Sequence, residues 1–115
     1  MSIASLISRL LGSSSVPAIE HEDMQKAVES GDCHIVDVRE PHEYAAGHIP
    51  GAENRPLSSF DPAKLPKGKP VVLVCQAGGR SANALQQSIA AGHKEIADYP
   101  PGTGGWRARG GPVSM

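Results

Sequence analysis

Short apolar runs alternate along this chain with segments whose apolar residues recur at helical spacing. Residues 70–74 are rich in valine and leucine, and this run predicts a buried strand. In residues 80–91 the apolar positions follow a mainly helical spacing, and Gly92 supplies the C-cap at which the predicted helix ends. A strand, a tight loop and a helix together make half of a βαβ unit.

Similar patterns on either side of this unit predict the remaining elements. We expect helices over residues 22–30 and 41–46, strands over residues 33–36, 52–55 and 95–98, and a connection over residues 56–69 with a turn within 57–65. Helices that alternate with short apolar strands predict an α/β fold with a parallel sheet. The length of 115 residues predicts one domain with a single modest core.

The first 16 residues form a separate segment ahead of the domain predicted for residues 17–115. Apolar side chains fall on one face of an amphipathic helix predicted within residues 1–11, and a serine-rich tether follows it. This helix could dock on its own domain, fray, or contact a partner protein or a second copy. Surface binding to a membrane is less favoured because Arg9 is the only positively charged side chain of the segment. The segment also lacks the basic start and unbroken apolar core of a secretory signal.

Charge and hydropathy argue against two classes of partner. The net charge of −1 gives no basis for electrostatic binding to nucleic acid. No run approaches the roughly 20 apolar residues of a transmembrane helix, so no transmembrane segment is predicted. The five histidines show no metal-binding spacing, and neither a metal nor an organic cofactor is predicted.

The two cysteines are predicted to remain free thiols. Cys33 opens one predicted strand and Cys75 follows the end of another, so in a parallel sheet they lie at opposite ends. A strand of five residues spans roughly 17 Å, whereas the Cα atoms of a disulfide lie less than about 7 Å apart. Free thiols are typical of a reducing cytoplasm, which is the predicted location.

The loop that follows the strand at residues 70–74 predicts a reactive cysteine. Cys75 lies at the carboxyl end of this strand, where the sites of parallel α/β sheets are found. Gly78 and Gly79 permit positive φ, so successive backbone N–H groups can converge on an anion. The helix dipole and Arg80 add positive charge, and together these features favour a thiolate at Cys75. The alternative is a buried structural cysteine before a turn, which the combination of features disfavours.

Three sets of residues resemble the signatures of single-domain rhodanese-like sulfurtransferases. Residues 75–81 look like the active-site loop of that family, and residues 35–40 and 43–54 are similar to its "DVRE…EY..GHIPGA.N" motif. Residues 102–106 and 110–113 resemble its "GG…W…GLPV" tail, so the match runs from residue 19 to residue 113. Pro101 stands where the family usually has a first glycine, and Gly111 stands where it usually has a leucine.

The resemblance implies a small central parallel sheet with helices on both faces and a rhodanese-type sulfurtransferase activity. It implies Cys75 as the catalytic nucleophile and no cofactor. It also implies a loop that binds the anionic substrate, formed by Gln76, Ala77, Gly78, Gly79, Arg80 and Ser81. Trp106 is expected to anchor the tail in the core.

Sulfur transfer is favoured over phosphate-ester hydrolysis by the size of this loop. The loop runs six residues from Cys75 to Arg80, whereas related phosphatases have one residue more. A phosphate therefore should not fit. The expected reaction begins when the Cys75 thiolate attacks the outer sulfur of a donor such as thiosulfate and forms a persulfide. A thiol, cyanide or a protein then accepts the sulfur, and Arg80 stabilises the anion.

Two other functions stay open at this point. The chain could be a sulfur-carrier or docking module whose acceptor is a partner protein, with little turnover of thiosulfate and cyanide. Gln76 and Ala77 support this alternative because both are neutral where some relatives that use thiosulfate carry basic residues. An inactive interaction domain is the third option, and the intact Cys75 argues against it.

Asp37, Arg39 and His48 are the further residues expected around the loop. Asp37 and Arg39 follow the first buried strand at its carboxyl end, and therefore near Cys75 in a parallel sheet. They could shape the rim of the pocket, but the favoured interpretation is a partly buried ion pair that pins the strand end to neighbouring loops. For His48, a hydrogen bond that holds its loop is favoured over the role of a catalytic base.

Overall fold

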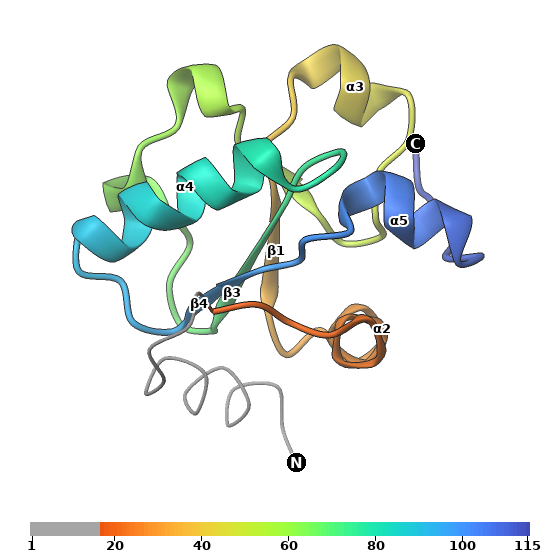
Figure 1. Ribbon diagram of the computed structural model, residues 1–115, viewed down its shortest axis with the longest axis horizontal. Coiled ribbons are helices and arrows are strands. Elements are labelled where there is room, and N and C mark those ends of the chain that lie inside the picture. Colours follow the sequence, from red (N-terminus) through yellow and green to blue (C-terminus); the bar gives the residue numbers. More distant parts are fainter. Residues whose placement is uncertain (1–16) are drawn as a thin grey trace.

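In the computed structural model, which describes residues 17–115, four short strands form one parallel sheet in the order β2-β1-β3-β4 (Figure 1). The strands are β1 (His34–Asp37), β2 (Glu53–Asn54), β3 (Val71–Val74) and β4 (Ile96–Asp98). The helices are α2 (His21–Ser30), α3 (Pro41–Ala45), α4 (Gly79–Ala90) and α5 (Gly102–Ala108), with short 3-10 turns at Leu57–Ser59 and Pro62–Lys64. The predicted parallel α/β fold is confirmed. The helix predicted within residues 1–11 lies outside the described residues.

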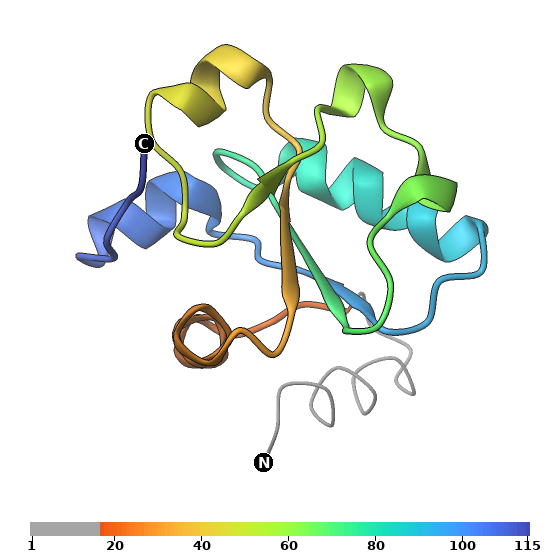
Figure 2. The ribbon, with the colours of Figure 1, turned by 180° about the vertical axis from the view of Figure 1, so that it is seen from behind.

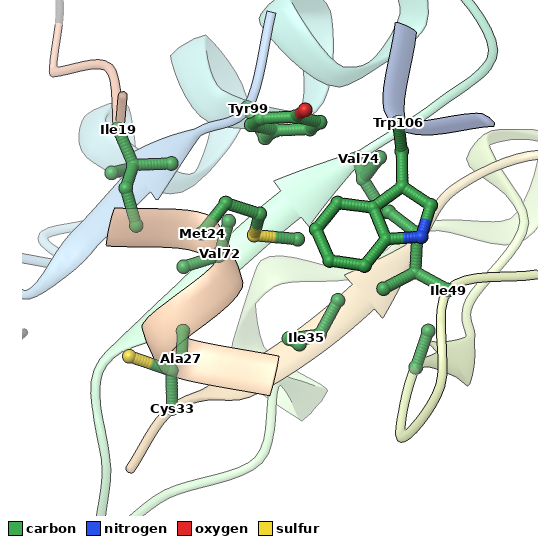
Figure 3. Close-up of a cluster of buried hydrophobic side chains, with 12 residues drawn as sticks. Ile19, Met24, Ala27, Cys33, Ile35, Ile49, Val72, Val74, Tyr99 and Trp106 are labelled. Carbon is green, nitrogen blue, oxygen red and sulfur yellow. The ribbon is translucent and has the colours of Figure 1, made fainter. Parts of the chain in front are cut away.

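Helices cover both faces of the sheet because successive strand residues point to opposite sides. Ile35, Val72 and Val74 pack on one face with residues of α2 and α5, including Met24 and Trp106. Figure 3 shows these side chains gathered between α2 and the sheet. The indole of Trp106 is buried there, as expected, and its Nε1–H donates to the carbonyl of Pro112 at 2.7 Å.

The second face of the sheet packs against α4. Leu73 and Cys75 of the β3 segment contact Ala84 and Leu85 of this helix in a second apolar cluster. Figure 2 shows α4 and α2 on opposite sides of the strands. Within residues 17–115, no helix combines the length and the apolar character that crossing a membrane requires.

The largest difference from the sequence-based expectation is α5. The segment Gly102–Ala108 contains three glycines, which disfavour a helix, and the sequence analysis predicted only a tail there. Tertiary contacts reverse this preference, because a Cβ at Gly102 would lie 2.5 Å from the carbonyl oxygen of Gln76. The glycines therefore allow α5 to approach the Cys75 loop closely.

The two departures from the family pattern both fit the packing of this tail. Pro101 precedes the first residue of α5 and lies against Gly105, where a Cβ would come within 2.4 Å of the proline ring. Gly111 lies against the indole of Trp106, where a Cβ would come within 2.3 Å. The ring of Pro101 thus fits against Gly105, and the absence of a side chain at Gly111 leaves room for the indole of Trp106.

Candidate active site

Cys75 follows the last residue of β3 and is almost completely buried. The backbone N–H of Gly78 points at its sulfur with an N···Sγ distance of 3.0 Å, and the Ser81 hydroxyl lies 3.4 Å from the same atom. Gly78 has φ +104°, and a Cβ there would come within 2.7 Å of the Pro100 carbonyl oxygen. The turn that directs its N–H to the sulfur therefore requires glycine.

Hydrogen bonds overcome the effect of burial on the Cys75 thiol. Burial alone would raise the pKa of this thiol. The side chain and the N–H of Ser81, together with the N–H groups of Ala77 and Gly78, have the larger combined effect and lower the pKa below its ordinary value. The arrangement thus favours a thiolate at the carboxyl end of β3, next to the N-terminus of α4.

The loop is open to solvent on one side and rests on α5 on the other. The side chains of Gln76 and Ala77 are exposed, so this part of the loop faces solvent. On the inner side, the N–H of Thr103 donates to the Cys75 carbonyl at 2.7 Å and the N–H of Gly104 donates to the Gln76 carbonyl at 3.1 Å. The tail therefore supports the backbone that holds the thiol.

The guanidinium of Arg80 is paired with Glu43, a residue of α3 that the sequence analysis did not single out. The two N–O distances of this pair are 2.6 and 2.9 Å. The hydrogen bond from Arg80 lowers the pKa of Glu43 to about 2, and burial opposes this only in part. The one local signal at Glu43 concerned the helix start, because Glu43 forms a capping box with Glu40 at the beginning of α3. No local pattern indicated its pair with Arg80.

Asp37 and Arg39 form a buried ion pair at the end of β1, with an Nη2–Oδ2 distance of 2.9 Å. Arg39 also donates to the Gly47 carbonyl at 2.7 Å and to the Gln76 side chain at 3.3 Å. The pair thus connects β1 with the turn at Gly47 and with the Cys75 loop. Arg39 therefore holds the Cys75 loop through the side chain of Gln76.

His48 contacts a different part of the chain. Its ring stacks on Tyr44 with a centroid distance of 3.7 Å, and its Nδ1 lies 2.9 Å from the Tyr44 carbonyl oxygen. Its backbone exchanges two hydrogen bonds with Ser114. Within residues 17–115, the hydrogen bonds of His48 thus join α3 to the chain end and do not reach the Cys75 loop.

Cys33 and Cys75 are both free thiols, on opposite faces and at opposite ends of the sheet. Burial, with a smaller contribution from the charge of Asp32, raises the pKa of Cys33 to about 11. The two cysteines therefore differ in acidity, although each is almost completely buried.

Comparison with known proteins identifies the family. A family model described as the rhodanese-like domain matches residues 20–109. Over 85% of its length the chain is 30% identical to the thiosulfate:glutathione sulfurtransferase of Saccharomyces cerevisiae, of which it covers 83%. Over 84% of its length it is 31% identical to the putative sulfur carrier protein YrkF of Bacillus subtilis, of which it covers 54%.

A solved structure agrees with this match. The rhodanese-related protein of Thermoplasma volcanium has a TM-score of 0.76 and 29% identity, over 85% of this chain and 97% of that one. The chain spans 45% to 62% of the length of three of its curated bacterial relatives. By sequence and by structure, the chain belongs to the family of rhodanese-like domains.

Proposed function

We propose that this protein is a sulfurtransferase that moves sulfane sulfur from a donor such as thiosulfate to a thiophilic acceptor through a persulfide on Cys75. The observation that carries the proposal is the convergence of the Gly78 N–H and the Ser81 hydroxyl on the Cys75 sulfur. These donors lower the pKa of a buried thiol, and they can stabilise negative charge on a sulfur bound to it.

The proposed reaction has two steps. In the first, the Cys75 thiolate attacks the outer sulfur of thiosulfate, a new S–S bond forms, and sulfite leaves with the electron pair of the broken bond. In the second, cyanide or a thiolate attacks the outer sulfur of the persulfide and the Cys75 thiolate is regenerated. The exposed side of the loop, at Gln76 and Ala77, is the proposed entry for both reactants.

The loop geometry favours sulfur over phosphate as the transferred group. Arg80 lies five residues after Cys75, one residue fewer than in the related phosphatases, and its guanidinium is held by Glu43. The Gly78 nitrogen is already 3.0 Å from Sγ, which suits one additional sulfur atom better than a tetrahedral phosphate. The loop geometry therefore supports sulfur transfer over phosphate-ester hydrolysis as the proposed chemistry.

A sulfur-carrier function is the second candidate. The mouth of the loop carries the neutral side chains of Gln76 and Ala77, and the charge of Arg80 is balanced by Glu43. Neither feature attracts a small dianion from solution, whereas a partner protein could deliver its sulfur by direct contact. The relative named as a putative sulfur carrier protein also agrees with this alternative.

Intact-protein mass spectrometry after exposure to thiosulfate tests the proposed function. We expect Cys33→Ser to gain one sulfur atom that cyanide or a dithiol removes, and Cys75→Ser to gain none. Cys33→Ser is the matched control because burial and Asp32 keep that thiol protonated at neutral pH. Sulfur uptake by Cys75→Ser equal to that of the unmodified chain would refute the nucleophile assignment.

Steady-state kinetics separates the two candidates. A sulfurtransferase turns over thiosulfate and cyanide many times per molecule. Stoichiometric persulfide formation with little turnover would favour the carrier.

A further inference from the structure

Asp98 is a buried carboxyl group for which the proposed reaction has so far given no role. It is the last residue of β4, only 4% of its surface is exposed, and its Oδ1 has no hydrogen-bond partner among the described residues. Leaving a buried carboxyl oxygen without a partner is destabilising. A carboxyl group in such a place therefore requires an explanation.

The register of the sheet places Asp98 on the same face as Cys75. Asp98 is the partner of Leu73 on β3, and Cys75 follows Leu73 by two residues, so all three side chains point toward α4. Sequence reasoning missed this residue, although an acid at the end of a short apolar strand is a signal. Only the register brings it to the side of the sheet that holds the thiol.

Ser81 connects the two groups. Its hydroxyl is completely buried and lies 3.4 Å from the Cys75 sulfur and 3.2 Å from the Gly78 carbonyl oxygen. The same side chain lies close enough to the Asp98 carboxyl group to lower its pKa. A hydroxyl has one proton to donate and can also accept, so Ser81 can transmit a proton between the sulfur and the carboxylate.

We propose that Asp98 accepts the proton of the Cys75 thiol through the Ser81 hydroxyl. The proton of Cys75 passes to the Ser81 oxygen while the proton of Ser81 passes to an Asp98 carboxylate oxygen. Cys75 becomes a thiolate, Asp98 becomes a neutral acid, Ser81 is unchanged and no electrons are transferred. The proposal rests on the function proposed above, in which Cys75 is the nucleophile.

The transfer leaves the net charge of the buried site unchanged. Before it, the negative charge is on a carboxylate with an unpartnered oxygen, and after it the charge is on a sulfur that accepts from Gly78. Burial raises the pKa of Asp98, and hydrogen bonds from Ser81 and the Tyr99 N–H oppose this only in part. The pKa of Cys75 is shifted in the opposite direction, so the two groups approach each other in acidity.

No other charged group competes for the Asp98 carboxyl among residues 17–115. On α4, Arg80 directs its guanidinium to Glu43. The segment beside β4, residues 17–19, contributes a proline, an alanine and an isoleucine and bonds to Asp98 through the backbone. On β3, the partner of Asp98 is the apolar Leu73, and Cys75 directly follows that strand.

The test measures alkylation of Cys75 by iodoacetamide as a function of pH, in a Cys33→Ser background. With Asp98 present, we expect the rate to rise in two steps separated by a plateau, because the two groups titrate as a coupled pair. In Asp98→Asn we expect one step, with a midpoint about one pH unit below the upper step, because no carboxylate opposes the thiolate. Asp61→Asn is the matched control, since it removes an exposed carboxylate outside the site, and we expect it to keep both steps.

Infrared spectroscopy at neutral pH locates the proton, and its main readout uses the unsubstituted chain before and after alkylation. We expect a carbonyl band of a protonated carboxylic acid that disappears when Cys75 is alkylated, because the neutral thioether no longer holds the proton at Asp98. The band should be absent in Asp98→Asn and also in Ser81→Ala, which keeps the carboxyl group but lacks the bridge. An Asp98 that does not exchange a proton with Cys75 would show no change in this band on alkylation.

The results distinguish failure of this inference from failure of the proposed function. A single titration step and no acid band, in a protein whose Cys75 still gains sulfur from thiosulfate, would overturn the proton transfer alone. No sulfur on Cys75 with the two-step titration and the band intact would overturn the sulfur transfer and retain the proton acceptor.

Discussion

The charge of Arg80 is balanced before any donor reaches the Cys75 loop. Its guanidinium forms a two-pronged pair with the Glu43 carboxylate, and both side chains are partly exposed. A dianionic donor must therefore compete with Glu43 for Arg80. Such a pair contributes less than about 1 kcal/mol near the surface, so competition is feasible.

Replacing Glu43 by glutamine should release Arg80 for the donor. We expect Glu43→Gln to lower the KM for thiosulfate about two- to five-fold, because the pair it removes is worth up to about 1 kcal/mol. The glutamine can still accept from the Glu40 N–H, so α3 keeps its cap. Glu53→Gln, which breaks an exposed ion pair with Arg55, is the control and should leave KM unchanged. A higher KM in Glu43→Gln would mean that Glu43 orients Arg80 for the donor.

The same variant should alter the acid side of the stability curve. The pKa of Glu43 in the folded protein is about 2, below its ordinary value of 4.5. The stabilisation is therefore fully present above pH 4.5 and is lost as the pH falls toward 2. Urea unfolding should show a difference between the original chain and Glu43→Gln that shrinks over this range.

At the scale of elements, α5 determines how the tail meets the Cys75 loop. Its first turn donates to the Cys75 and Gln76 carbonyls, and Trp106 anchors it in the core. Glycines that weaken an isolated helix allow this one to lie against a backbone turn. The low helix propensity of its glycines predicted an irregular tail, but packing against the Cys75 loop stabilises a helix over Gly102–Ala108.

Gly111 is predicted to be required next to Trp106. We expect Gly111→Ala to lower the free energy of unfolding by about 1–3 kcal/mol, because its Cβ would lie 2.3 Å from the indole. A leucine, the usual residue of the family here, carries the same Cβ and should also destabilise this chain. Gly79→Ala is the control, since a Cβ there meets nothing within 4 Å, and it should be neutral or stabilising. Equal stability of both variants would contradict this account of the tail.

At the scale of the whole molecule, the pair of Asp37 and Arg39 joins three segments that are distant in the sequence. Asp37 ends β1, and Arg39 bonds to the turn at Gly47 and to Gln76 in the loop. The ion pair with Asp37 and the hydrogen bond to Gln76 fix the Cys75 loop relative to the sheet. The site thus depends on the assembled fold as well as on the seven residues of the loop.

Breaking this buried pair should cost stability before it changes the chemistry. We expect Asp37→Ala and Arg39→Ala each to lower the free energy of unfolding by about 3 kcal/mol, because each leaves a buried charge without a partner. The double variant should lose much less than the sum of the two. Chemical denaturation of the three variants checks this, and strictly additive losses would show that the two side chains act independently.

The sequence by itself determined the features that depend on residues close together in the chain. The apolar run before Cys75, the glycine at position 78 and the helical spacing after it predicted the strand, the turn and the helix that hold the thiol. Most element bounds were predicted within a residue or two, because caps and periodicity are local signals. The strand predicted over residues 33–36 continues to Asp37, since tertiary pairing with Arg39 makes a charged residue acceptable there.

Only the tertiary structure decided which side chains face one another across the loop. Glu43 reaches Arg80 from 37 residues away, and Asp98 shares a face with Cys75 because of strand register. Helix α5 likewise forms against a loop that is distant along the chain. Contacts of this kind depend on how separate elements pack, and no local pattern of hydrophobic and polar positions encodes them. The loop around Cys75 could therefore be predicted from the sequence. The positions of Glu43 and Asp98 beside that loop could not, because they depend on how distant elements pack.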